Sequence, residues 1–251
     1  MNIVLHISYD GTRFVGWQKT NLDPKRFPSI QYVLESVISQ ILRHPVELQA
    51  ASRTDRGVHA AGQVVNFHTS LSELNLERFL YSLNCLLPED IRAQAALVAE
   101  ESFHPTLSNT AKEYHYRIAY GKILSPFLRF THWHFPYALN SDSMRKAAIF
   151  LIGTHDFRAF RNHRKGLDEN DTVRHILAID VEDGPDQTLC IKMTGNNFLY
   201  KMARNIAGTL AYVGCGKLQE GQVKDLVAGA SRPDAGVTAP ACGLTLYRVM
   251  Y

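Results

Sequence analysis

Apolar residues recur along this chain with two different spacings. Residues 29 to 43 carry an apolar stripe at the three- and four-residue spacing of an amphipathic helix, namely Ile30, Val33, Leu34, Val37, Ile38, Ile41 and Leu42. Pro28 and Pro45 mark the two ends of this predicted helix. Near the N-terminus, Ile3, Leu5 and Ile7 occupy alternate positions. That alternation predicts a half-buried strand.

The same two spacings predict the remaining elements. Further helices are expected at residues 76 to 83, 141 to 152, 198 to 213 and 219 to 228. Further strands are expected at residues 46 to 50, 63 to 68, 91 to 98, 114 to 120, 175 to 182, 189 to 194 and 244 to 250. Long strand runs of antiparallel character, with helices between them, favour an α+β fold over a doubly wound parallel sheet.

Composition places the chain among folded proteins that stay out of the membrane. Its 251 residues suffice for a sizeable core, and 45% are apolar against 20% charged. No apolar run approaches the roughly 20 residues of a membrane span. The N-terminus alternates like a strand without a charged leader, so no signal peptide is predicted. The four cysteines form no C-x-x-C pair, which predicts a reducing cytoplasm and no structural zinc held by thiolates.

Charge is unevenly distributed along the sequence. The formal net charge is only +3, but residues 104 to 175 hold eleven Lys or Arg and six Asp or Glu, a net of +5. They also hold seven of the eleven histidines. The rest of the chain has 16 basic and 18 acidic residues, a net of −2. This middle segment is therefore a candidate phosphate-facing surface, with an ordinary solvated face as the alternative.

One short polar run carries the strongest chemical signal. Between two predicted strands, Asp55 stands between Arg53 and Arg56, and the turn residue Gly57 follows. Arginine neighbours favour the ionised form of a carboxylate, and their forked donors match phosphate oxygens. A charged carboxylate beside phosphate-binding groups suits nucleophilic chemistry on a nucleic acid. The same residues also fit a surface turn that contains an Arg–Asp ion pair.

The run Ser52 to Ala60 resembles the central motif of the TruA-type tRNA pseudouridine synthases. Further blocks of that family occur in the same order, with a similar tail at residues 243 to 249. The blocks are Tyr9-Asp10-Gly11-Thr12, Gly16-Trp17-Gln18, Lys112-Glu113-Tyr114, Gly153-Thr154-His155-Asp156-Phe157 and Gly195-Asn196-Asn197-Phe198-Leu199-Tyr200 with Met202 and Arg204. Residues 19 to 29 depart from the family pattern, because an insertion with Lys25 and Arg26 replaces a short link.

The resemblance implies a fold and an assembly. We expect two related α+β halves, residues 1–105 and 106–251, that share a central, mainly antiparallel sheet flanked by helices. The catalytic cleft would lie between them. The family also implies a cytoplasmic homodimer, with tRNA as its partner.

The implied reaction converts uridine to pseudouridine at positions 38, 39 and 40 of the anticodon stem-loop of tRNA. The C1′–N1 bond breaks, the uracil turns, and a C1′–C5 bond forms. Product and substrate contain the same atoms, so neither a cofactor nor a metal is expected. The target base must leave its stack to be reached. By resemblance Asp55 supplies the carboxylate, either as a nucleophile at C1′ or as a base at C2′ that gives a glycal.

The resemblance assigns three further residues. Arg204 matches the arginine that pairs with the catalytic aspartate. Tyr114 matches the tyrosine that packs on the target base, although strand alternation puts Tyr116 on the same face, so spacing alone does not choose between them. Arg53 is the candidate for filling the gap left by the flipped uridine or for holding its phosphate.

Two other functions compete with this interpretation. A metal-dependent hydrolase would use His132, His134, His155 and Asp156 as ligands, but no third spaced cluster completes such a site. An RNA-binding module without activity would not need Asp55.

Overall fold

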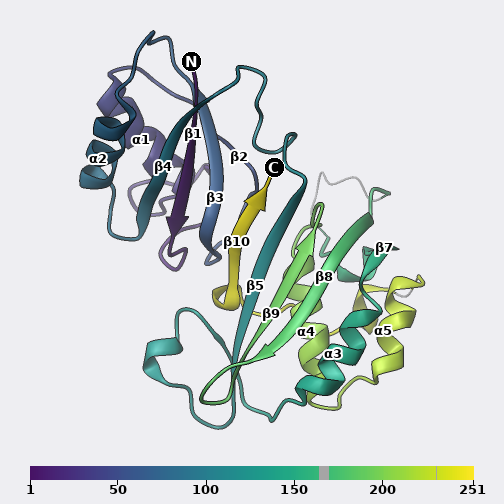
Figure 1. Ribbon diagram of the computed structural model, residues 1–251. Helices are drawn as coiled ribbons and strands as arrows, with labels where there is room; N and C mark the ends of the chain where they lie inside the picture. The colour runs from purple at the N-terminus through teal and green to yellow at the C-terminus, as the bar shows by residue number, and fades with distance from the viewer. Residues whose placement is uncertain (164–169, 230) are drawn as a thin grey trace. The chain divides into compact units, whose positions relative to one another are not determined.

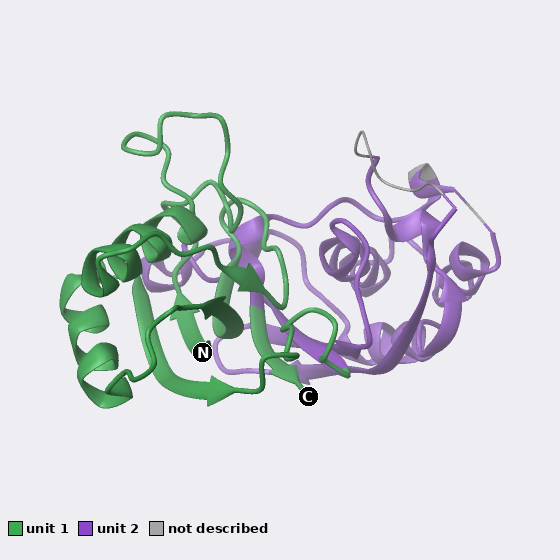
Figure 2. Ribbon diagram, turned by 90° about the horizontal axis from the view of Figure 1, so that it is seen from above, with its two compact units in different colours: residues 1–110, 246–251 green, residues 111–245 purple. Residues whose placement is uncertain are grey.

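The computed structural model describes residues 1–163, 170–229 and 231–251, so residues 164–169 of the basic middle segment lie outside it. The chain is an α+β protein with a large mixed sheet flanked by helices, the class that the sequence predicts (Figure 1). It divides into two compact units (Figure 2), which are residues 1–110 with 246–251, and residues 111–245. No helix within the described residues has the length and apolar character needed to cross a membrane.

The first unit packs two helices on one face of an antiparallel sheet (Figures 1 and 2). β1 lies between β3 and β4 and is antiparallel to both, while β2 pairs with β3. The last residues of the chain return to this unit, where the Thr110 backbone N–H donates to the Met250 carbonyl at 2.8 Å. The elements are β1 (Asn2–Tyr9), α1 (Ile30–Leu42), β2 (Gln49–Ala50), β3 (His59–His68), α2 (Leu76–Leu86), β4 (Ile91–Ala99) and β10 (Leu244–Met250).

Helix α1 forms where the apolar stripe predicts it. Ser29 caps its start by accepting a hydrogen bond from the Tyr32 backbone N–H at 3.2 Å. Arg43, in the left-handed region at φ 58°, ends it. Residues of the stripe such as Leu34 and Ile38 are buried in the core. The predicted helix is thus confirmed to within one residue at each end.

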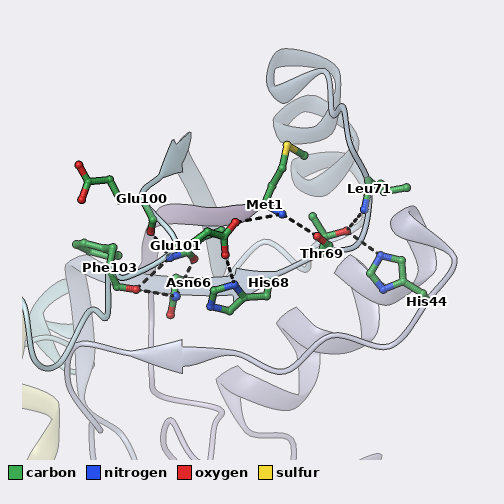
Figure 3. Close-up of polar contacts among 10 residues, drawn as sticks. Met1, His44, Asn66, His68, Thr69, Leu71, Glu100, Glu101 and Phe103 are labelled. Carbon is green, nitrogen blue, oxygen red and sulfur yellow. Dashed lines mark hydrogen bonds and ion pairs between the residues drawn. The ribbon is translucent and has the colours of Figure 1, made fainter.

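Polar contacts fix the beginning of β1 against its neighbours (Figure 3). The Met1 ammonium group donates to the Thr69 carbonyl at 2.9 Å. The Asn2 side chain donates to the Phe103 carbonyl at 3.0 Å and accepts from the Asn66 amide at 2.8 Å. These bonds satisfy the buried side-chain amide of Asn2 and the side-chain N–H group of Asn66, which would otherwise destabilise the fold. They hold the strand on which Tyr9 lies.

The second unit places three helices on one face of a four-stranded antiparallel path, β5-β9-β8-β7 (Figures 1 and 2). β6 runs parallel to β5, which makes the sheet mixed. The elements are β5 (Ala111–Tyr120), η1 (Pro126–Leu128), β6 (Trp133–Phe135), α3 (Ser141–Ile149), β7 (Gly153–Asp156), η2 (Arg158–Phe160), β8 (Val173–Asp183), β9 (Thr188–Gly195), α4 (Met202–Gly214), α5 (Glu220–Val227), η3 (Arg232–Asp234) and η4 (Ala241–Gly243).

The two largest differences from the predicted boundaries lie at the starts of α4 and β3, and the short strands β6 and β7 were not predicted. α4 begins at Met202, four residues later than the pattern suggests, because Lys201 adopts the left-handed conformation at φ 62°. β3 begins at His59, four residues earlier than predicted, because Ala60 pairs with Tyr9 of β1. In both places a tertiary contact or a single backbone conformation overrides the local pattern.

Candidate active site

Asp55 lies in the loop of residues 51–58, between β2 and β3, which we call the Asp55 loop. The Val58 N–H donates to the Asp55 carbonyl at 3.1 Å, and Gly57 has φ +77°. This is the arrangement of a type II turn, which requires a left-handed residue at the position that Gly57 occupies. The loop and turn predicted from the sequence are therefore present.

Hydrogen bonds hold the Asp55 loop on both sides of Arg53. The buried Gln63 side chain of β3 donates to the Ser52 carbonyl at 2.7 Å and accepts from the Ser52 N–H at 3.3 Å. The Trp17 N–H donates to the Thr54 carbonyl at 3.0 Å. The hydroxyls of Tyr9 and Thr54 share a buried hydrogen bond of 2.8 Å. The backbone that carries Asp55 is thus fixed by β1, β3 and the residue 10–17 segment.

Two glycines allow the residue 10–17 segment to approach the Asp55 loop. A Cβ on Gly11 would lie 2.0 Å from the Val58 carbonyl oxygen. A Cβ on Gly16 would lie 2.8 Å from the Thr54 carbonyl oxygen, and Gly16 also has φ +113°. Only glycine fits these positions without moving the backbone. The two N-terminal blocks seen in the sequence therefore meet the Asp55 motif in space.

A second polar group supports the end of the loop. His59 Nδ1 lies 3.2 Å from the Gly11 backbone nitrogen and 3.1 Å from Asp10 Oδ1. Burial by itself would raise the pKa of Asp10, but the hydrogen bonds from Thr12 and the nearby His59 outweigh it and hold that pKa below its usual value. Asp10 and His59 therefore serve the structure of the turn.

The Asp55 loop turns its cations outward. Arg53 and Arg56 are exposed, whereas Asp55 between them is half-buried and Thr54 is buried. The structure therefore brings the three charged residues of the motif into one loop. Two guanidinium groups face solvent beside a carboxylate with limited exposure, which is an arrangement suited to an anionic substrate.

In the second unit, the two candidate tyrosines differ in what they contact. Both are buried on the same face of β5. The Tyr116 hydroxyl donates to the Pro240 carbonyl at 2.7 Å, and burial raises the pKa of Tyr116 well above its usual value. The Tyr114 ring meets the Phe198 ring edge-on, with 4.9 Å between centroids. Tyr116 is thus tied into the fold through its hydroxyl.

Arg204 lies half-buried in the first turn of α4. Its Nε donates to the Ala239 carbonyl at 2.7 Å, and the Ala239 N–H donates to the Arg204 carbonyl at 3.2 Å. The next residue, the buried Asn205, donates to the Phe160 carbonyl at 2.6 Å and accepts from Arg232 at 2.9 Å. The position of the guanidinium is therefore set by the chain that follows α5.

The histidines of the metal-hydrolase alternative contact backbone groups or neighbouring side chains. His134 Nε2 lies 2.9 Å from the Gly121 carbonyl oxygen, and His155 Nε2 lies 2.9 Å from that of Ile152. His132 Nδ1 lies 3.0 Å from the Thr131 hydroxyl. Across the described residues, no three His, Cys, Asp or Glu side chains gather as a metal site.

Known proteins match this chain along its whole length. A family model described as tRNA pseudouridine synthase matches residues 6–105 and 147–251. tRNA pseudouridine synthase A 2 of Protochlamydia amoebophila is 47% identical over 250 residues, covering 100% of this chain and 94% of that protein. tRNA pseudouridine synthase A of Thermoanaerobacter sp. is 41% identical over 250 residues, covering 100% and 99%. That of Bacillus subtilis is 40% identical over 253 residues, with the same coverage.

A solved structure titled Crystal Structure of a Cbf5-Nop10-Gar1 Complex aligns with 97% of this chain and 57% of that chain, at 11% identity and a TM-score of 0.38. A score this low supports no comparison between the two.

These matches define an isomerase of the pseudouridine synthase class. The chain belongs to the tRNA pseudouridine synthase family, as the sequence motifs indicate. Asp55, Arg53 and Arg204 lie inside the ranges that the family model matches, and Tyr114 lies between those ranges. Nothing in the sequence motifs points to Gln63, whose hydrogen bonds to Ser52 appear only in the folded chain.

Replacing Gly16 by alanine should damage both stability and activity. The new Cβ would collide with the Thr54 carbonyl at a positive φ, so we expect a loss of about 1–3 kcal/mol in the free energy of unfolding and a lower kcat. Urea unfolding and single-turnover rates measure the two effects. Gly221→Ala is the matched control, because a Cβ there meets nothing within 4 Å. Equal effects of the two substitutions would contradict the close approach.

Proposed function

We propose that this protein isomerises uridine to pseudouridine at positions 38, 39 and 40 of the anticodon stem-loop of tRNA, in the cytoplasm. The chain's membership of the tRNA pseudouridine synthase family supports tRNA as the substrate. The observation that carries the proposal for the residues is the fixed Asp55 loop, in which a half-buried carboxylate stands between two exposed arginines.

Asp55 is the group that acts on the sugar. In one route its carboxylate attacks C1′ and the C1′–N1 electron pair leaves with the uracil. The uracil then turns, C5 forms the new bond to C1′, and the carboxylate departs. In the other route Asp55 removes the C2′ proton to give a glycal and returns it after the turn. In both, C5 loses a proton and N1 gains one, so the atoms balance.

Tyr114, Arg204 and Arg53 complete the proposed site. Tyr114 packs on the target base, a role that its place in the family motif supports, and its ring meets the Phe198 ring edge-on. Arg204 pairs with the Asp55 carboxylate, the role that its place in the family motif supports. Arg53, exposed beside Ser52 whose backbone is fixed, fills the gap left by the flipped uridine or holds its phosphate.

Neighbouring target positions with differing sequence require recognition by shape and backbone. Contacts that are specific for one base sequence cannot recognise three successive positions of a stem-loop whose sequences differ. The exposed arginines of the Asp55 loop and the basic middle segment suit that mode, because guanidinium groups bind phosphates without regard to base identity. Neither metal nor cofactor is needed, since isomerisation adds and removes no atoms.

Asp55→Asn should abolish isomerisation and leave tRNA binding within about threefold of the unmodified protein. An amide neither attacks C1′ nor accepts the C2′ proton, while the arginines that face phosphate remain. Tritium release from C5-labelled uridine in tRNA measures turnover, and filter binding measures affinity. Asp225→Asn in α5 serves as the control and should retain full activity. Turnover by purified Asp55→Asn, prepared in a host free of this activity, would refute the assignment of Asp55.

Tyr114→Ala should remove the stacking of the target base, worth about 1–3 kcal/mol, so kcat/KM should fall by roughly 5- to 150-fold. Tyr114→Phe should retain most of the rate, because the ring is kept. The control is Tyr116→Phe, which loses a hydrogen bond to Pro240 and should cost about 0.5–1.5 kcal/mol of stability without loss of rate. A larger loss of kcat/KM in a folded Tyr116→Ala than in Tyr114→Ala would show that Tyr116 contacts the base.

We also propose that the active form is a symmetric homodimer. A 251-residue chain with a net charge of +3 offers limited basic surface for a folded tRNA, and a two-fold axis doubles that surface. Light scattering at micromolar concentration should give about twice the 28.3 kDa chain mass. A monomer that modifies full-length tRNA at the normal rate would exclude this assembly.

A further inference from the structure

Residues 121–131 form a loop, with the short helix η1, that follows the end of β5. In Figure 1 this segment is the teal loop beyond the lower end of β5. The chain returns through β6, which runs parallel to β5. The Gly121 N–H donates to the Phe135 carbonyl at 3.0 Å, and the Leu128 N–H donates to the Ser125 carbonyl at 3.0 Å. Both the base of the loop and its short helical turn, η1, are therefore internally bonded.

This loop displays large apolar side chains to solvent. Ile123 is 89% exposed, Phe127 is 90% exposed and Phe130 is 45% exposed. Exposed apolar side chains gathered on one short segment mark an interaction surface and not an element of the core. Because Phe127 buries almost none of its ring in this fold, it contributes little to folding. Its ring is therefore accessible to another molecule.

Charge identifies the chemistry of that other molecule. No Asp or Glu occurs between Glu113 and Asp142, while Lys122 and Arg129 lie within the loop and are exposed. The Arg129 guanidinium lies 4.1 Å from the centroid of the Phe130 ring. Cations interleaved with exposed aromatic rings suit nucleic acid, where phosphates meet the cations and bases stack on the rings.

A second copy of this chain fits the loop less well. A two-fold contact places the same patch on both sides of the interface. Where the two-fold axis passes through the loop, two copies of Lys122 and Arg129 meet with no acid in the segment to offset them, and like charges across an interface cost free energy. A polyanion meets no such penalty.

We propose that residues 121–131 are an accessory binding surface for the tRNA substrate. Phe127 stacks on an unpaired base, and Lys122 and Arg129 contact phosphates of neighbouring nucleotides. The proposal rests on the proposed function only for the identity of the RNA. It concerns a surface outside the ranges that the family model matches, and this surface belongs to the second compact unit, whereas the Asp55 loop belongs to the first.

Binding of full-length tRNA to Phe127 variants tests the surface. Phe127→Ala should raise the Kd by roughly 5- to 150-fold, the range for loss of one stacked base. Phe127→Trp should bind within about threefold of the original protein, because it keeps a ring. Phe127→Leu should resemble Phe127→Ala, because it keeps an apolar side chain but no ring. Leu107→Ala is the control, since Leu107 is 81% exposed and lies in the other unit.

The salt dependence of the tRNA affinity tests the proposed phosphate contact of Lys122. Lys122→Gln should reduce the slope of log K against log salt by about one, as expected for one lost phosphate contact. The single-turnover rate of Phe127→Ala at saturating enzyme should equal that of the original protein. If the proposed role of Asp55 is wrong, Asp55→Asn will turn over tRNA. If the proposed surface is wrong, only the tRNA affinities of the Phe127 and Lys122 variants will show it.

Three results would overturn the proposal. They are an unchanged Kd for Phe127→Ala, full affinity in Phe127→Leu, and a Phe127→Ala variant that loses its oligomeric state by light scattering. The last would make the loop a subunit interface. An unchanged salt slope in Lys122→Gln would remove the phosphate contact.

Discussion

The close approach of two backbone segments, residues 10–17 and 54–58, is the constraint on which the Asp55 loop depends. Only glycine at positions 11 and 16 allows it, since a Cβ at either would overlap the opposite carbonyl oxygen. Once the segments touch, the Trp17 N–H reaches the Thr54 carbonyl. The contact also links the loop to α1, because the Gln31 N–H donates to the Trp17 carbonyl at 3.0 Å. A carboxylate held this way needs little rearrangement before it reacts.

Local patterns predicted much of this structure. The stripe from Ile30 to Leu42 gave α1 almost to the residue, and Gly57 between two strand runs indicated the turn that follows Asp55. These local patterns do not predict contacts between residues that are distant in the sequence. The bond from Gln63 to Ser52 and the bond from Asn205 to Phe160 join polar residues that look like ordinary strand and helix positions. Such partners emerge only when the chain folds.

The site residues show the same limit. The motifs located Asp55, Arg53, Tyr114 and Arg204, and their roles stay predictions. Spacing left Tyr114 and Tyr116 equivalent, because both face one side of β5. The Tyr116 hydroxyl donates to the carbonyl of Pro240, which is 124 residues further along the chain. No local pattern contains that information.

Two segments of this molecule combine groups that are hydrogen-bonded within the fold with side chains that stay exposed to solvent. In the Asp55 loop, Ser52 and Thr54 are bonded inward, while Arg53 and Arg56 face solvent. Burying an arginine without a partner is costly, whereas an exposed one binds phosphate at small cost. In the loop of residues 121–131, backbone bonds fix the chain and leave Phe127 outward. In both segments internal hydrogen bonds already restrict the backbone. Binding of RNA therefore loses little free energy to ordering these segments.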